Sequence, residues 1–420
     1  MAINPSLKIA AEKMSTQEWR MCLPIFVMVS LYAAGTAAVL PVLPFYVRDM
    51  GGSPLILGII MATEALIQFT SAPVLGQLSD RFGRKRILFA SQFLGTVSLL
   101  MLASAPGIII VMLARMLFGI TAGNIPVAAA YIADYSLPSH RRQAIGILTG
   151  CVGLGGILGA GLAGLLSEYS LVAPLYAAVM FTLVAGVVTL LLLNNASSVP
   201  PQKVINGTRK VPFSTVLMSP VIRTLIILML CHCFAYGLYS SQMPVFLGET
   251  FIWNSHAFGT KELSFIIVAD GIINVIVQIF LLGSLNRYAT ERNLIIFIFS
   301  LICCGVLIAG FASTIPVLAL AVLCISTGDA LAKPTYLAAL SVHAPNERQG
   351  LVMGSAQALN AITDIFAPVL GGFIMGYALY GVWIGIVVAV TVVGTIVALI
   401  QLPKSDPESD ESREKHTSTG

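Results

Sequence analysis

The chain has 420 residues, of which 57% are hydrophobic and only 10% are charged, and its formal net charge is +4. A soluble domain carries about 25% charged residues, so this composition excludes an ordinary water-soluble protein. No stretch combines Lys and Arg with exposed aromatic residues in the way that nucleic-acid binding requires, which argues against a nucleic-acid partner.

Long apolar runs follow a short polar N-terminal segment. A helix needs about 20 apolar residues to cross the hydrocarbon core of a bilayer. The first runs of this kind cover 22–47, 55–78, 87–105, 107–133, 143–167 and 172–193. Further runs cover 221–247, 262–285, 293–312, 315–341, 349–377 and 380–402. The first run is longer than a signal-peptide core and lacks a cleavage site, so we expect it to remain as a span.

A polar segment rich in proline separates the two sets of runs. The sequence therefore predicts an all-α membrane protein with twelve transmembrane helices in two six-helix bundles. The expected parts are an N-terminal bundle over 1–193, a cytoplasmic linker over 194–220, a C-terminal bundle over 221–402 and a charged tail over 403–420.

Basic residues are distributed unevenly between the predicted loops. All but four of the 23 Lys and Arg residues fall on the side of the N-terminus, the linker and the tail. Arg48 and Lys261 fall on the other side, while Arg115 and Lys333 lie inside predicted spans. Because cytoplasmic loops carry the excess of Lys and Arg, we expect both termini in the cytoplasm.

The two halves of the chain are related by an internal repeat. A shift of 206 residues aligns Leu57–Leu88 with Leu263–Leu294 without a gap. Glu64 then coincides with Asp270 near the middle of a span. Apolar matches between membrane helices carry little information, but a carboxylate in the same register does. We interpret the halves as a parallel repeat, which is typical of transporters.

The loop after the second predicted span carries the most specific motif in the chain. From Gly76 to Arg86 it reads GQLSDRFGRKR, which is similar to the GxLaDrxGrkr signature of the major facilitator superfamily. A generic basic loop explains neither Asp80 nor the two glycines. Gly76 is expected to let two helices approach closely, and Gly83 to permit the tight turn between spans.

Further stretches extend the resemblance along the chain. Leu40–Pro44 looks like the proline motif of twelve-span drug:proton antiporters, and Arg115–Gly119 is similar to the RxxxG motif of the fourth span. The pair Asp134-Tyr135, followed by Arg141, resembles the end of that span and its loop.

The antiporter motif of the fifth span departs from the family pattern, which is GxxxGPxxGG. Gly155 and Gly159 match, but Ala160 replaces the proline and Ala163 replaces one glycine. We therefore expect close packing of small residues there without a proline kink.

The resemblance implies a network of charges that closes the cytoplasmic side of the protein. The residues that match this gate are Gly76, Asp80, Arg81, Gly83, Arg84, Asp134 and Arg141. Arg84 is expected to pair with Asp134, and Asp80 to cap the start of the eleventh span. Asn286 replaces Asp80 in the second half, so the matching latch there should be weaker.

Six ionisable residues lie inside predicted spans, where each costs roughly 2.5–3.5 kcal/mol on insertion scales. We expect proton coupling by the carboxylates Glu64, Asp270 and Asp364, and a substrate cavity lined by Arg115, Asp329, Lys333 and Asn124. Structural alternatives remain open. Asp329 and Lys333 are four residues apart and could neutralise each other. Arg115 could be a packing arginine paired with one carboxylate, and His232 a satisfied interior histidine.

The seven cysteines all lie in or beside apolar runs and show no paired spacing, so neither a disulfide framework nor a metal site is expected. Cys231, His232 and Cys233 are adjacent, but neighbouring residues of a helix point in different directions.

Taken as a whole, the resemblance implies proton-coupled efflux of small amphiphilic organic compounds by alternating access. It also implies a monomer in a bacterial inner membrane, with a small-molecule substrate, protons and lipid as partners and no cofactor. The alternative is a proton-coupled importer of a polar nutrient or a siderophore-like chelate, since Arg115 and Lys333 could hold an anionic group. Motifs of hydrolases and of phosphate-binding loops are absent from the sequence, so an enzyme is not expected. A channel and a non-transporting sensor or scaffold are weaker alternatives.

Overall fold

The computed structural model describes residues 16–121, 124–137, 140–194, 219–253, 256–344 and 349–403. Within these residues it consists of helices joined by short loops, together with one small hairpin. It contains 12 helical stretches that are long and apolar enough to cross a membrane. The prediction of an all-α membrane protein with twelve spans is confirmed.

The first six spans contain two interrupted helices. Their elements are α1 (Thr16–Val39) with α2 (Leu43–Asp49), α3 (Pro54–Phe82), α4 (Arg84–Ala103), α5 (Ile108–Ile120) with α6 (Asn124–Tyr135), α7 (Arg141–Leu166) and α8 (Ala173–Leu192). Gly83 separates α3 from α4 with a φ of 94°, a conformation that favours glycine. The expected tight turn at this glycine is confirmed.

The last six spans begin with α9 (Pro220–Thr250), which is followed by the antiparallel strands β1 (Ile252–Trp253) and β2 (His256–Ala257). The eighth span is composite and consists of α10 (Thr260–Ile276), the π-helical segment η3 (Val277–Leu281) and α11 (Leu282–Tyr288). The others are α12 (Glu291–Gly310), α13 (Ile315–His343), α14 (Gln349–Gly376) and α15 (Tyr380–Gln401).

Contacts between residues divide the chain into two units. One unit contains Met1–Gly52, Thr63–Asn206 and Gly259–Gly271. The other contains Ser53–Ala62, Gly207–Phe258 and Ile272–Gly420. Consequently α3 and α10 each begin in one unit and end in the other.

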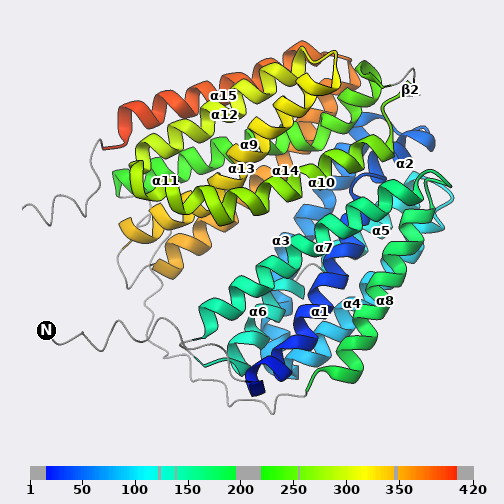
Figure 1. Ribbon diagram of the computed structural model, residues 1–420. Coiled ribbons are helices and arrows are strands. Elements are labelled where there is room, and N and C mark those ends of the chain that lie inside the picture. The colour runs from blue at the N-terminus through cyan, green and yellow to red at the C-terminus, as the bar shows by residue number, and fades with distance from the viewer. Residues whose placement is uncertain are drawn as a thin grey trace, which may run out of the picture. The chain divides into compact units, whose positions relative to one another are not determined.

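Helix packing follows the same order in both units. In the first, α1 packs against α7 and α8, and α4 packs against α5 and α8 (Figure 1). In the second, α9 packs against α14 and α15, and α12 packs against α13 and α15. Each of these contacts in the first half therefore recurs six spans later, in agreement with the sequence repeat.

The glycines of the fifth span bring two backbones together. A Cβ at Gly155 or Gly159 would collide with the backbone of α1, at Ser30 and Ala34 respectively. Ala160 is fully buried, and α7 has no internal proline. The expected close packing without a proline kink is therefore present.

Two backbone irregularities occupy the same place in the repeat. Pro73 lies inside α3 and cannot donate a backbone hydrogen bond. The hydroxyls of Thr70 and Ser71 donate to backbone carbonyls of the preceding turn. The shift of 206 residues places Ile279, the centre of η3, on Pro73. A π-helical turn inside an α-helix is rare and often lies at a functional site.

Candidate functional site

An ion pair links the second and fourth spans within the first unit. Arg115 Nη2 on α5 donates to Glu64 Oε2 on α3, and both side chains are largely buried. The guanidinium also lies over the ring of Phe118, 5.0 Å from its centroid. Tyr32 of α1 stacks on the same ring, with centroids 6.4 Å apart. The structure agrees with the alternative in which Arg115 pairs with one carboxylate.

The glycine of the RxxxG motif explains how this pair forms. A Cβ at Gly119 would stand 2.8 Å from the carbonyl oxygen of Glu64 and 3.1 Å from the side chain of Ile67. Ser71 Oγ donates a hydrogen bond of 3.0 Å to the Gly119 carbonyl. The fourth span can therefore approach α3 closely one helical turn after Arg115, which holds the two charged groups in contact.

Asn124 begins α6 and is 1% exposed. Its side chain lies within hydrogen-bonding reach of the Tyr32 hydroxyl on α1. Its assignment to the substrate cavity stays a prediction.

A second polar pair lies inside the other unit. His232 Nε2 on α9 lies 3.2 Å from Asp329 Oδ1 on α13, and the histidine is 4% exposed. Its ring is parallel to that of Tyr236 at 6.1 Å and tilted to that of Tyr336 at 5.7 Å. His232 is thus engaged inside the bundle.

One structural alternative, in which Asp329 and Lys333 pair with each other, is contradicted. No ion pair joins them, although the structure describes both residues. Because α13 packs against α9, the imidazole of His232 lies beside the carboxylate of Asp329 and contacts its Oδ1. Proximity along one helix therefore does not decide the pairing.

Two other charged residues differ in their surroundings. Asp364 on α14 is exposed and forms no ion pair within the part of the chain that is described. Asp270 on α10 interacts with another group. Their assignments to proton coupling stay predictions.

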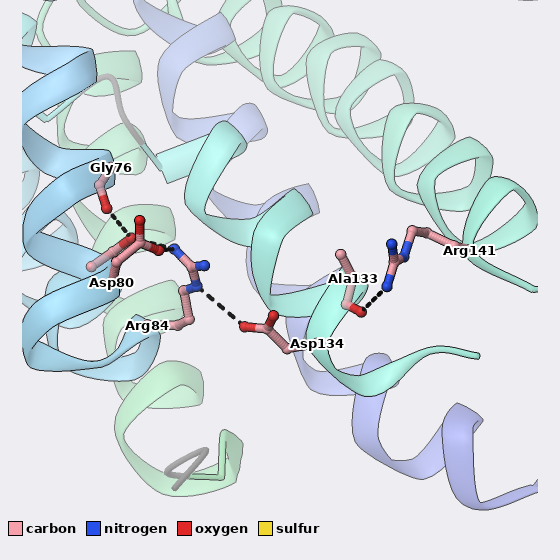
Figure 2. A network of polar contacts seen from close by, with 7 residues as sticks. Gly76, Asp80, Arg84, Ala133, Asp134 and Arg141 are labelled. Carbon is pink, nitrogen blue, oxygen red and sulfur yellow. Dashed lines mark hydrogen bonds and ion pairs between the residues drawn. The ribbon is translucent and has the colours of Figure 1, made fainter. Parts of the chain in front are cut away.

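The predicted gate forms a chain of contacts at the ends of α3 and α6 (Figure 2). Arg84 lies between two carboxylates, with Nη1 2.5 Å from Asp80 Oδ1 and Nε 3.2 Å from Asp134 Oδ2. The same Nη1 donates to Ser79 Oγ at 2.6 Å. Arg141 Nη2 donates to the carbonyl of Ala133 at 2.8 Å. The expected pairing of Arg84 with Asp134 is confirmed.

Two expectations for this motif need revision. A Cβ at Gly76 would meet nothing within 4 Å, so the expected close helix approach there is wrong. The Gly76 carbonyl accepts a hydrogen bond from Ser79 Oγ at 2.7 Å. Arg81 lies over the ring of Phe82 and makes no ion pair with the described residues. The cap by Asp80 on the eleventh span stays a prediction.

The second half carries a different pair at the matching ends of its helices. Glu291 Oε2, at the start of α12, lies 3.3 Å from His343 Nε2, at the end of α13. The shift of 206 residues places them at positions 85 and 137, close to Arg84 and Asp134. Sequence reasoning missed this pair because the basic and acidic partners are exchanged. The side chain of Asn286 lies outside the part of the chain that the structure describes, so the expected weaker latch there stays a prediction.

A further pair in the first unit was also not anticipated from sequence. Glu18 at the start of α1 is 7% exposed and accepts from the backbone N–H of Leu137 at 2.9 Å. Its other oxygen lies 3.0 Å from His140 Nδ1. These contacts tie the first span to the segment before α7, and no motif or hydropathy pattern marks them.

Comparisons with known proteins agree with this architecture. A family model described as Major Facilitator Superfamily matches residues 25–363. The chain is 30% identical over 352 residues to the class C tetracycline resistance protein of Escherichia coli, covering 81% of this chain and 86% of that protein. It is 26% identical over 348 residues to multidrug resistance protein 2 of Bacillus subtilis, covering 81% and 85%.

Solved structures share the fold. The chain resembles the human organic anion transporter MFSD10 with a TM-score of 0.65 and 19% sequence identity, over 91% of this chain and 100% of that one. At this identity the likeness supports the fold alone.

Proposed function

Because the chain belongs to the Major Facilitator Superfamily, we propose that it exports small amphiphilic organic compounds in exchange for protons by alternating access. The protein is a multi-pass membrane transporter and not an enzyme. Efflux is supported by relatives whose names record resistance to tetracycline and to multiple drugs. The proposal further places a monomer in a bacterial inner membrane with both termini in the cytoplasm, in line with the distribution of basic residues.

The ion pair of Glu64 with Arg115 is the observation that carries the proton-coupled part of the proposal. When Glu64 is ionised, it neutralises the buried guanidinium. When Glu64 takes up a proton, Arg115 is left as an uncompensated buried charge, which is strongly unfavourable. Proton binding therefore changes which arrangement of α3 and α5 is stable, and this is the requirement for coupling a proton to a conformational change.

Asp270 and Asp364 supply further carboxylates at mid-span positions. A cationic substrate competes with a proton for the same negative charge, which gives exchange by mutual exclusion. In this scheme Asn124, Asp329 and Lys333 line the substrate pathway, because charged and polar side chains within spans face water-filled cavities. The network around Arg84 closes the cytoplasmic end between transport steps.

Import of an anionic nutrient or chelate is the second candidate. It is favoured by Lys333, which is exposed and forms no ion pair among the described residues. Direction of transport distinguishes the two candidates, since efflux and symport respond oppositely to the sign of an imposed pH gradient.

The test uses purified protein in proteoliposomes with an imposed pH gradient and ethidium as the probe. Wild-type protein should move ethidium toward the more acidic side, while Glu64→Gln should bind and exchange the dye without concentrating it. Glu168→Gln is a matched control, because its carboxylate lies beyond α7 and is half exposed. Full gradient-driven transport by both Glu64→Gln and Asp270→Asn would refute the coupling assignment. Accumulation that requires the proton and the probe to move in the same direction would favour import.

A further inference from the structure

The charged groups inside the spans are not all neutralised in the same way. Glu64 pairs with Arg115, and Asp329 pairs with His232. Asp270 interacts with another group. That leaves one cation and one anion, Lys333 and Asp364, which form no ion pair within 4 Å among the described residues.

These two groups belong to the same unit and lie on helices that touch. Lys333 is on α13 and Asp364 is on α14, and the two helices pack against each other. Both side chains are exposed and not covered by protein. Since ionisable residues inside spans face the bundle interior or a water-filled cavity, the two charges are accessible from that side.

Asp329 does not pair with Lys333. Asp329 is four residues before Lys333 on α13, the spacing at which opposite charges pair on a helix surface. Asp329 Oδ1 instead contacts the imidazole of His232, and no ion pair within 4 Å joins Asp329 to Lys333. A charged residue inside a span is costly and ordinarily paired, so the unpaired Lys333 points to a ligand.

We propose that the substrate is a zwitterionic amphiphile whose carboxylate binds Lys333 and whose ammonium group binds Asp364. The inference rests on the proposed transport function and names the substrate class of the same pathway. A zwitterion satisfies both charges at once and brings no net charge into the membrane. A simple cation satisfies Asp364 and leaves Lys333 unpaired, and a simple anion does the reverse.

The ammonium group also connects this site to exchange. At Asp364 it takes the place that a proton otherwise occupies, so the substrate and the proton exclude each other. The carboxylate at Lys333 contributes affinity and selectivity. The two residues therefore have separable effects, which a matched set of probes can resolve.

The test measures binding of four fluorescent probes to purified full-length protein in detergent at neutral pH. The probes are Nε-dansyl-lysine, which is a zwitterion, its methyl ester, which is a cation, its Nα-acetyl form, which is an anion, and the Nα-acetyl methyl ester, which is neutral. Wild-type protein should bind the zwitterion at least roughly tenfold more tightly than each of the other three, since each charge-assisted hydrogen bond contributes 1.5–3 kcal/mol.

Substitutions should remove this preference one charge at a time. Lys333→Gln should abolish the preference for the zwitterion over its ester, and Asp364→Asn the preference over its Nα-acetyl form. Lys333→Arg retains the cation and should retain the preference. Lys261→Gln is a control, because this lysine lies at the start of α10 and pairs with Glu168. A thermal unfolding midpoint close to that of wild type establishes that each variant is folded.

Two results would overturn the inference. One is an equal loss of binding affinity for all four probes in the folded variants Lys333→Gln and Asp364→Asn, since this indicates a general effect on the bundle. The other is wild-type binding of the ester as tightly as the zwitterion. If ethidium is still concentrated in proteoliposomes, either result leaves the proposed function intact. Absence of gradient-driven movement of every probe refutes the proposed function itself.

Discussion

The carbonyl oxygen of Glu64 lies 2.8 Å from the point where a Cβ of Gly119 would stand. This close approach of α5 to α3 occurs one helical turn beyond the ion pair of Glu64 with Arg115. The glycine thus determines how near the two charged side chains can come.

We expect Gly119→Ala to separate α5 from α3 and to lower gradient-driven transport at least roughly tenfold. Overpacking of this kind typically destabilises by about 1–3 kcal/mol. Gly150→Ala is the control, because a Cβ at that position meets nothing within 4 Å. Transport and thermal unfolding are measured together. Equal transport by the two variants would show that the close approach is not needed.

The position of Arg84 between two carboxylates predicts the behaviour of the gate. Asp80→Asn and Asp134→Asn should each weaken the contact and shift the protein toward the state that is open to the cytoplasm. Transport should fall more than substrate binding, because the substrate pathway is not altered. Arg84→Lys should behave similarly, since lysine cannot bind two carboxylates with a planar guanidinium.

Distance measurements between a spin label at Phe82, at the end of α3, and one at Leu351, near the start of α14, test the gate. An unchanged distance distribution in Asp80→Asn would show that this network does not hold the gate.

The pair of His232 with Asp329 predicts a loss of stability when only one partner is removed. His232→Leu leaves the Asp329 carboxylate without its hydrogen bond, at a penalty of about 1–3 kcal/mol. Asp329→Asn in the same protein should recover part of that loss, because the neutral amide is less costly to leave unpaired. The measurement is thermal unfolding of the two single variants and the double variant. Strict additivity of the two single effects would contradict the pairing.

The packing of α7 on α1 gives a separate prediction for stability. Gly159→Ala places a methyl group against the backbone at Ala34 and should lower the free energy of unfolding by about 1–3 kcal/mol. Gly156→Ala is three residues away on the same helix, has open space, and should change stability little. Equal unfolding midpoints for the two variants would exclude a close backbone contact.

Membrane topology is tested by labelling single cysteines in a protein whose seven native cysteines have been replaced. Cysteines at Lys203 and Lys404 should react only from the cytoplasmic side, and a cysteine at Lys261 only from outside. Termini on opposite sides would contradict the even number of spans on which the orientation depends.

The spans can be predicted from the sequence to within a few residues, because hydropathy over about 20 residues is a strong signal. It also anticipated the contact of Arg84 with Asp134, since a specific motif carries it. It missed the pairs of Glu18 with His140 and of Glu291 with His343. Such partners are far apart in the chain and lie at helix ends, where neither periodicity nor hydropathy marks them.

The sequence identifies the charges inside the spans, but it does not decide how they pair. Helical spacing favoured Asp329 with Lys333, whereas packing of α9 on α13 selected His232. Likewise, no sequence signal shows that the first part of α3 groups with the second unit, or that the first part of α10 groups with the first unit. Contacts between helices decide both features, and they arise only when the bundle is assembled.

The π-helical segment gives the eighth span a tolerance for length that an α-helix lacks. In an α-helix the loss of one residue rotates everything after it by about 100°, because there are 3.6 residues per turn. A π-turn contains one residue more than the α-helical turn it replaces, so loss of a single residue within Val277–Leu281 restores regular helix and leaves α11 facing as before. The second span, where Pro73 stands at the equivalent place in α3, has no such spare residue. A deletion of Ile279 should therefore be far less harmful than a deletion of Pro73. The eighth span can lose this one residue while α10 and α11 keep their orientation relative to each other.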